Sequence, residues 1–314
     1  MPDIRDDKAQ HVIPFILSLL SQHQTQHAND SNPPPFFIGL NGVQGAGKSV
    51  LVDILKKTLS SPPHNLSTVV FSLDDLYLTH TDQVSLAQSH PDNPLLQHRG
   101  QPSTHDVSLG LSVFASLKAN KPTKIPQYNK AAFSGQGDRI PDGEWEEVNT
   151  DPSSPVRVVL FEGWSVGFRP LSPQGLEAKH SAAVSALQNS TPSNPYNSRL
   201  GHNTLKSVTA INDALKAYDQ LTSQLDAFIH IDAADPLFVY KWRLEQEANL
   251  RASRGSGMTD EQVKQFVDGY YPAYELYTDT LRDGVFKDTK TNWQGRQLRL
   301  IVGEDRRVKE VVTI

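Results

Sequence analysis

The residues whose types and spacing most clearly suggest chemistry form a glycine-rich loop after an apolar run at 36–40. Glycines let the backbone wrap a phosphate with its N–H groups pointing inward, a lysine reaches the β- and γ-phosphates, and a serine hydroxyl can bind Mg²⁺. An amphipathic helix begins after the loop, and its N-terminus favours negative charge. The pattern predicts a Walker A loop that holds a nucleoside triphosphate through Gly42, Gln44, Gly45, Ala46, Gly47, Lys48, Ser49 and Val50. The alternative is a glycine-rich turn with no ligand.

Two aspartates follow the next apolar run, in the segment Ser72-Leu73-Asp74-Asp75-Leu76-Tyr77. Ligands of open α/β sheets gather at the carboxyl ends of the strands, so acidic residues at this point can act on a substrate. We expect Asp74 to accept a proton from a substrate hydroxyl, and Asp75 and Tyr77 to contact the substrate. The alternative is structural, because aspartate is also common at helix N-caps and in solvated turns.

A third apolar run, 158–161, ends in Glu162-Gly163-Trp164 and has the form of a Walker B element. Its carboxylate would hold the Mg²⁺ shell together with Ser49, and Gly163 would let the chain turn out of the sheet. A glutamate at the end of a strand means little alone. The interpretation therefore depends on the upstream phosphate loop.

Basic side chains are spread over two loops between the second and third runs. Arg99, His105, Lys130 and Arg139 lie among glycines, and such groups suit an anionic or polyhydroxylated small substrate. Each signal is weak when taken singly. A lone histidine such as His105 is more often a hydrogen-bonded structural residue than a ligand or base, and Asp106 could be no more than a helix cap.

The segment after the fourth apolar run carries a basic helix. Asp235-Pro236 resembles an N-cap and a first-turn proline, and at 100° per residue Arg243 and Arg254 lie within about 20° of each other, with Arg251 about 80° away. Thr259-Asp260-Glu261-Gln262 has the form of a capping box that starts a second helix. We expect a lid at about 236–270 whose arginines close over the phosphates. The alternative is a solvated basic face paired with Glu245 and Glu247.

Composition limits the classes of protein that these groups serve. The chain has 314 residues, of which 37% are hydrophobic and 21% charged, with a net charge of −5 and no cysteine. Disulfides and thiolate metal sites are therefore excluded. The absence of a sustained basic stretch argues against a nucleic-acid partner, and no segment has the pattern of a signal peptide or a membrane span. We expect a cytoplasmic protein with no membrane partner.

The elements that must position these groups follow from apolar periodicity. Strand-like runs recur at 36–40, 69–73, 156–161, 227–231 and 298–302, with helical patterns between them. Five strands joined by crossovers predict an α/β fold with a five-stranded, parallel, doubly wound sheet and a helical lid. Residues 1–35 should form a helix starting near Pro14 and a proline-rich linker, and 36–314 one domain with a polar insertion at about 172–209. Only a weak helix at 182–187 is expected there, and the stripe of Tyr270, Tyr274, Tyr277 and Leu281 is assigned to the core.

The ordered set of motifs resembles the D-glycerate 3-kinase-like branch of the phosphoribulokinase/uridine kinase superfamily of P-loop kinases. The likeness covers roughly 36–171 and 226–303. It rests on the Walker A loop, Ser72-x-Asp74-x-Leu76-Tyr77, Arg99-Gly100-x-Pro102-x-Thr104-His105-Asp106, Pro126-x-Tyr128-x-Lys130, Gly137-Asp138-Arg139, Phe161-Glu162-Gly163-Trp164 and Met258-Thr259-Asp260-Glu261-Gln262-Val263. Leu76, Ser103, Asn129 and Ala131 depart from residues frequent in that superfamily. They stand near the presumed acceptor site, so they bear on the identity of the acceptor.

The resemblance implies ATP with Mg²⁺, phosphoryl transfer to a small hydroxylated metabolite, and Asp74 in the position of the catalytic aspartate. We expect D-glycerate as the acceptor, with Lys48 and Arg251 beside Asp74 in catalysis. The enzyme alternatives are a nucleoside or pantothenate-type kinase, and the other class is an ATP-binding regulatory protein without an acceptor. A regulatory GTPase is disfavoured because no Asn-Lys-x-Asp tetrapeptide occurs.

Overall fold

The structure is a computed structural model that describes residues 6–254, 257–287 and 291–314, apart from the side chains of 253 and 254. Its centre is a six-stranded sheet in the order β10-β9-β8-β1-β7-β2. Five of these strands are parallel: β1 (Phe36–Gly42), β2 (Thr68–Ser72), β7 (Val158–Gly163), β8 (Ala227–Ala233) and β9 (Gln297–Val302). The predicted parallel sheet is confirmed.

A sixth strand, which the sequence analysis did not predict, lies at the edge of the sheet. It is β10 (Val308–Thr313), antiparallel to β9, with an irregularity in register between Val308 and Glu310. Most of its residues are exposed or half-buried, so it lacks the continuous apolar run by which the other strands were found.

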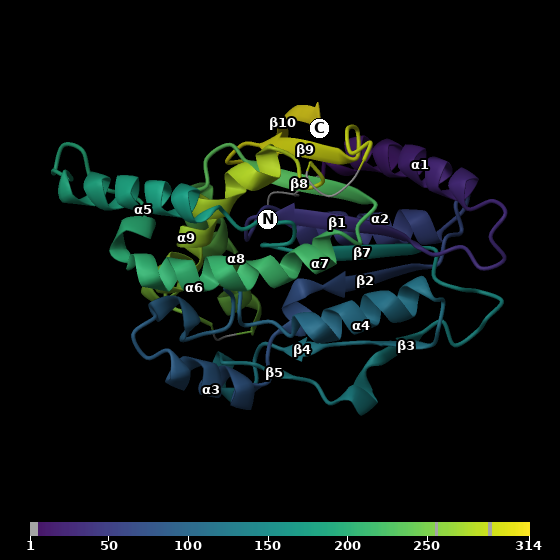
Figure 1. Ribbon diagram of the computed structural model, residues 1–314, viewed down its shortest axis with the longest axis horizontal. Helices are drawn as coiled ribbons and strands as arrows, with labels where there is room; N and C mark the ends of the chain where they lie inside the picture. Colours follow the sequence, from purple (N-terminus) through teal and green to yellow (C-terminus); the bar gives the residue numbers. More distant parts are fainter. Residues whose placement is uncertain (1–5, 255–256, 288–290) are drawn as a thin grey trace.

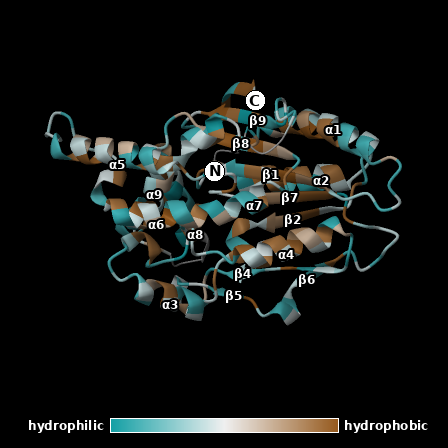
Figure 2. Ribbon diagram, in the orientation of Figure 1, coloured by the Kyte–Doolittle hydropathy of each residue, from teal (hydrophilic) through white to brown (hydrophobic). Residues whose placement is uncertain are grey.

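Helices cover both faces of the sheet (Figure 1). The central strands are mostly hydrophobic, whereas the helices carry both hydrophobic and hydrophilic residues (Figure 2). All seven residues of β1 are buried. Neighbouring side chains on a strand point to opposite faces. The ring of Phe36 lies 5.3 Å from His23 on α1 (Ala9–Gln26), whereas Phe37 stacks at 5.1 Å on Phe114 of α4 (Val107–Lys118). α2 (Lys48–Ser60) contacts both α1 and β1.

The first helix begins earlier than expected. It starts at Ala9, whose N–H donates to the Asp6 carboxylate at 2.9 Å, and Pro14 lies inside it on the solvent side. Pro14 is the sixth residue of α1, past the first four N–H groups that have no partner within a helix, so it removes one hydrogen bond of the helix without ending it. The proline alone was therefore a misleading start signal.

Two long helices follow β8. They are α8 (Phe238–Arg254) and α9 (Asp260–Arg282), and the capping box predicted at the start of the second is present between Thr259 and Gln262.

In the polar region before β8, the helix α5 is much longer than the expected 182–187. It spans Pro173–Gln188, with Ser172 as its N-cap, and projects from the body of the molecule in Figure 1.

Two small sheets and several shorter helices complete the described chain. Two small sheets pair β3 (Thr123–Ile125) with β6 (Glu146–Val148) and β4 (Tyr128–Asn129) with β5 (Asp138–Arg139). The remaining helices are α3 (His80–Ser89), α6 (Leu205–Leu215), α7 (Asp219–Thr222) and the 3₁₀ turns η1 (Leu73–Leu76), η2 (Pro94–Leu96), η3 (Phe133–Gly135), η4 (Asp142–Glu144), η5 (Leu200–His202) and η6 (Lys216–Tyr218). No helix in the described ranges combines the length and apolar character needed to cross a bilayer.

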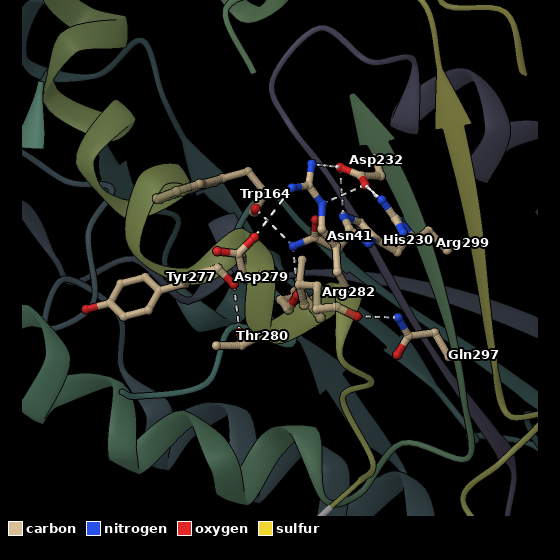
Figure 3. A network of polar contacts seen from close by, with 12 residues as sticks. Asn41, Trp164, His230, Asp232, Tyr277, Asp279, Thr280, Arg282, Gln297 and Arg299 are labelled. Atoms are coloured by element: carbon tan, nitrogen blue, oxygen red, sulfur yellow. Dashed lines mark hydrogen bonds and ion pairs between the residues drawn. The ribbon is translucent and has the colours of Figure 1, made fainter. Parts of the chain in front are cut away.

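The C-terminal end of α9 is fixed to the sheet by a buried charge network (Figure 3). Asp232, at the end of β8, accepts hydrogen bonds from the guanidinium groups of Arg282 on α9 and Arg299 on β9, with Arg282 Nε at 2.9 Å and Arg299 Nε at 2.8 Å. Burial alone would raise the pKa of Asp232, but these hydrogen bonds and charges hold it below its usual value. The aspartate is therefore ionised and fully occupied by protein donors.

Candidate active site

The glycine-rich loop joins the end of β1 to the start of α2. Gly45 and Gly47 have φ of +80° and +95°, a region that favours glycine, and α2 begins directly at Lys48. The Lys48 ammonium donates to the carbonyl of Gly42 at 2.8 Å. Burial lowers the pKa of Lys48, and the nearby carboxylates of Glu162 and Asp74 act in the opposite direction. The loop therefore presents a helix N-terminus and one lysine to the same space.

Three residues outside the loop contact its backbone and stabilise its conformation. A side chain at Gly45 would meet the Cβ of Trp242 on α8 at 2.5 Å, so only glycine fits. The Nε of Arg306 donates to the Gly45 carbonyl at 2.8 Å, and the Gln44 N–H donates to the hydroxyl of Tyr274 at 3.3 Å. Tyr274 is buried, as expected for the core, but its hydroxyl also contacts the loop. No local sequence signal marked these three contacts.

The acidic residues of β2 and β7 lie side by side. Ser72 is paired with Glu162 in the sheet, its hydroxyl donates to the Glu162 carboxylate at 2.8 Å, and it accepts the N–H of Asp74 at 3.2 Å. Both oxygens of Asp75 accept backbone N–H groups, from Ser72 at 3.3 Å and Tyr128 at 3.2 Å. Burial and the neighbouring Asp74 raise the pKa of Asp75 to about 6. Asp75 thus caps η1 through the Ser72 N–H and binds this turn to β4 through the Tyr128 N–H. The first contact is the capping role expected as the structural alternative.

The two oxygens of Asp74 differ: one is hydrogen-bonded within the described chain, and the other, called the open oxygen below, has no partner there. Its Oδ2 pairs with the ammonium of Lys130 at 2.5 Å, whereas the buried Oδ1 has no hydrogen-bond partner in the described ranges. Burial alone would raise the pKa of Asp74, but Lys130, with His105 and Lys48 further off, holds it below its usual value. The carboxylate is therefore charged at neutral pH with an unused acceptor atom.

His105 lies against the same turn. Its ring stacks on Tyr77 at 4.4 Å, its Nδ1 is 2.7 Å from the hydroxyl of Tyr218, and its buried Nε2 has no partner among the described residues. Burial lowers the pKa of His105 to about 4, so the ring is neutral at neutral pH. Tyr218 was not singled out in the sequence, because its approach depends on the packing of η6 against the turn before α4.

The two loop arginines, Arg99 and Arg139, donate hydrogen bonds to backbone carbonyls. Arg99 donates to the carbonyls of Gly135, at 2.7 Å, and Gln136, and lies 5.7 Å from the ring centre of Tyr128. Arg139 donates to the Tyr77 carbonyl at 2.9 Å and pairs with Asp106, which caps α4. The Nε of Arg139 is buried and has no partner in the described part of the chain. These arginines brace the loops that surround Asp74 and His105.

The predicted lid arginines have different surroundings. Arg243 is mostly buried and pairs with Glu247 at 3.6 Å. Its positive charge also helps to lower the pKa of Lys48. Glu247 also accepts the Met258 N–H at 2.7 Å, so it links α8 to the turn before α9. Arg251 donates to the Met258 carbonyl at 3.0 Å and pairs with Asp260 at 2.7 Å within that turn. The side chain of Arg254 lies outside the described residues.

Several known proteins are similar to this chain over most of its length. A solved D-glycerate 3-kinase from Cryptococcus neoformans var. grubii superimposes with a TM-score of 0.86 at 37% identity, covering 98% of this chain and 100% of that one. The uncharacterized kinase mug58 of Schizosaccharomyces pombe is 39% identical over 253 residues, 80% of this chain and 84% of the relative. The probable ATP-dependent kinase TDA10 of Saccharomyces cerevisiae is 32% identical over 279 residues, 86% and 87% of the two chains.

This chain belongs to the D-glycerate 3-kinase-like family of P-loop kinases. The predicted resemblance and kinase fold are thereby confirmed, and the chain is a phosphotransferase with an alcohol acceptor. No protein-family model matches the sequence. The assignment therefore rests on relatives that align over most of its length.

Proposed function

We propose that the enzyme transfers the γ-phosphoryl group of ATP to D-glycerate. The observation that carries this proposal is the open oxygen of Asp74, which is held charged beside a phosphate loop and a neutral histidine. The named substrate of the Cryptococcus relative supports the choice of acceptor. D-Glycerate offers a hydroxyl for Asp74 and an anionic group for the surrounding basic residues.

On the nucleotide side, Gly42 to Val50 would bind the phosphates through backbone N–H groups, and Lys48 would hold the β- and γ-phosphates. Ser49 and Glu162 provide oxygen ligands, the type that Mg²⁺ prefers. Within the described residues no cluster of three His, Asp or Glu side chains forms a metal site, which suits a metal held mainly by phosphates and water. Bound Mg²⁺ would neutralise charge on the phosphates.

On the acceptor side, the attacking hydroxyl would donate its hydrogen bond to Asp74 Oδ1. Its oxygen forms the new bond to the γ-phosphorus while the bond from that phosphorus to the bridging β,γ-oxygen breaks, the proton passes to Asp74, and ADP leaves. The lowered pKa makes Asp74 a weak base, which suits a loose transition state in which the proton moves late and orientation matters most. Lys130, Arg99, Arg139, Tyr77 and Asp75 would shape and position the acceptor pocket.

The lid would complete the site. Arg243, already beside the loop, would contact the phosphates, and Arg251 and Arg254 would join it when α8 and α9 close. Arg251 would then exchange Asp260 for phosphate and stabilise charge in the transition state. We further propose that the enzyme acts in the cytoplasm on a small molecule, without a nucleic-acid or membrane partner.

The test is a coupled ADP-release assay on D-glycerate, glycerol, pantothenate and uridine, with MgATP, beside a melting curve with and without MgATP. We expect turnover with D-glycerate above the other acceptors, a melting temperature raised by MgATP, and loss of both in Lys48→Ala. Higher turnover with pantothenate or uridine would identify that compound, and not D-glycerate, as the acceptor. Binding of MgATP with no turnover on the whole panel would favour the regulatory alternative.

A further inference from the structure

The surroundings of His105 fix the position of its ring. Tyr77 stacks on one face with ring centres 4.4 Å apart, and Tyr218 packs edge-on at 5.6 Å. The backbone on either side is bound to the neighbouring turn, since Leu78 N–H donates to Thr104 at 2.9 Å and Asp106 N–H donates to Leu76 at 2.7 Å. The ring therefore has little freedom to rotate or swing, and its two nitrogens have distinct environments.

The hydrogen bonds around Tyr218 determine where its proton goes. The hydroxyl of Tyr218 is buried, and its hydrogen bond in the described chain is with His105 Nδ1 at 2.7 Å. The backbone N–H groups of Ser103 and His105 act against the rise that burial causes in the pKa of Tyr218, as donors near its oxygen do, and an oxygen with such donors nearby keeps its own proton free to donate to Nδ1. The proton is also firmly held, because burial raises the pKa of Tyr218 well above that of an exposed tyrosine.

A neutral imidazole has one donor nitrogen and one acceptor nitrogen. If Nδ1 accepts from Tyr218, the ring proton must be on Nε2. We propose that Tyr218 is a positioning residue that fixes His105 as the Nε2–H tautomer, so that this N–H donates to an oxygen of the phosphoryl acceptor. This inference rests on the proposed function, because it assigns the proton that the acceptor meets.

Two unpaired atoms support a ligand between His105 and Asp74. His105 is 5% exposed, and its Nε2 has no partner in the described chain; the same is true of Asp74 Oδ1. The two residues interact through their charges, but no hydrogen bond joins them. A buried donor without a partner is costly, and a hydroxyl or carboxylate oxygen of the acceptor would satisfy it. An acceptor lacking that oxygen would leave the donor unpaired, which is a basis for selectivity.

The direct test is a nitrogen-15 correlation spectrum of the full chain labelled at histidine, which distinguishes the two neutral tautomers. The signal of His105 is assigned by its absence from His105→Gln. We expect the Nε2–H tautomer in the wild type and a loss of that preference in Tyr218→Phe. Observation of the Nδ1–H tautomer in the wild type would overturn the proposal, whatever the activity of the enzyme.

Kinetics provide the second readout. Tyr218→Phe should raise the KM for D-glycerate roughly 3- to 10-fold, the usual worth of one hydrogen bond, and leave the KM for MgATP unchanged. Tyr277→Phe is the matched control, because it removes another buried hydroxyl, one with no hydrogen-bond partner in the described chain. Equal effects of the two variants would overturn the proposal. Wild-type protein inactive on the whole acceptor panel but carrying the Nε2–H tautomer would overturn only the proposed function and the donation to its acceptor.

Discussion

Two aspartates stand at the carboxyl ends of strands in this sheet, and the protein binds both oxygens of one but only one oxygen of the other. Asp232 has both oxygens bound by the guanidinium groups of Arg282 and Arg299 (Figure 3), and only 2% of its side chain is exposed. Asp74 has one oxygen bound by Lys130, while the other is buried with no partner among the described residues. In both cases neighbouring cations outweigh burial, which alone would raise the pKa.

A structural carboxylate can be distinguished from a catalytic one by how many of its oxygens the protein binds. A carboxylate whose oxygens are all bound by the protein has no atom left for a substrate, and it holds elements together. A charged carboxylate with one buried oxygen that no protein donor reaches keeps an acceptor that only a ligand or water can satisfy. The comparison therefore assigns the first aspartate to the anchoring of α9 and the second to chemistry.

The largest expected effect is on turnover in Asp74→Asn. The amide keeps the shape and some hydrogen bonding but removes the charge, so kcat for D-glycerate should fall by roughly 10²- to 10⁴-fold. Affinity for MgATP, measured by titration, should survive because the phosphate loop is intact. Undiminished turnover would show that the open oxygen is not the proton acceptor.

The opposite pattern is expected in Asp232→Asn. Two arginines would lose their shared anion, and breaking a buried ion pair costs roughly 3 kcal/mol or more of the free energy of unfolding. Chemical denaturation should show this loss, while kcat measured well below the melting temperature stays near that of the wild type. Asp279→Asn is the control, since its side chain is 60% exposed and its pairs with Lys179 and Arg282 should each be worth less than about 1 kcal/mol. An Asp232→Asn variant that unfolds like the wild type but has lost turnover would show that Asp232 also serves the reaction.

The smallest effect is expected at Ser103, which has a positive φ. Its φ is +92°, a conformation that strains a side chain, and it stands two residues before His105. Ser103→Gly relieves that strain but adds freedom to the unfolded chain, so the net gain in stability should be at most about 1 kcal/mol. Denaturation curves measure it. A loss of stability would show that the serine side chain makes a compensating contact.

The parts of the site that stand at the end of an apolar run could be predicted from the sequence. The phosphate loop, the two aspartates of η1 and the glutamate near the end of β7 each do so, and parallel strands bring their carboxyl ends to one edge. The sheet could be predicted for the same reason, since its five parallel strands are buried on both faces and read as continuous apolar runs.

The parts that depend on tertiary packing could not be predicted. Tyr218 reaches His105 across 113 positions, and Arg306 reaches Gly45 across 261, so no local pattern marks either contact. Arg251 illustrates the reverse case: its place on a basic helix face was predicted, but the structure binds it to Asp260 in the lid turn. Its role at the phosphates remains a prediction.

The central claim is that Asp74 with its open oxygen directs transfer to a hydroxyl of D-glycerate. Phosphorus NMR of a reaction containing the wild-type enzyme, MgATP and D-glycerate tests it most directly, with Asp74→Asn and Asp232→Asn run in parallel at a temperature where all are folded. We expect ADP and one new phosphomonoester on glycerate with the wild type and Asp232→Asn, and almost none with Asp74→Asn. Equal product from Asp74→Asn, or none from a folded, ATP-binding wild type, would contradict it.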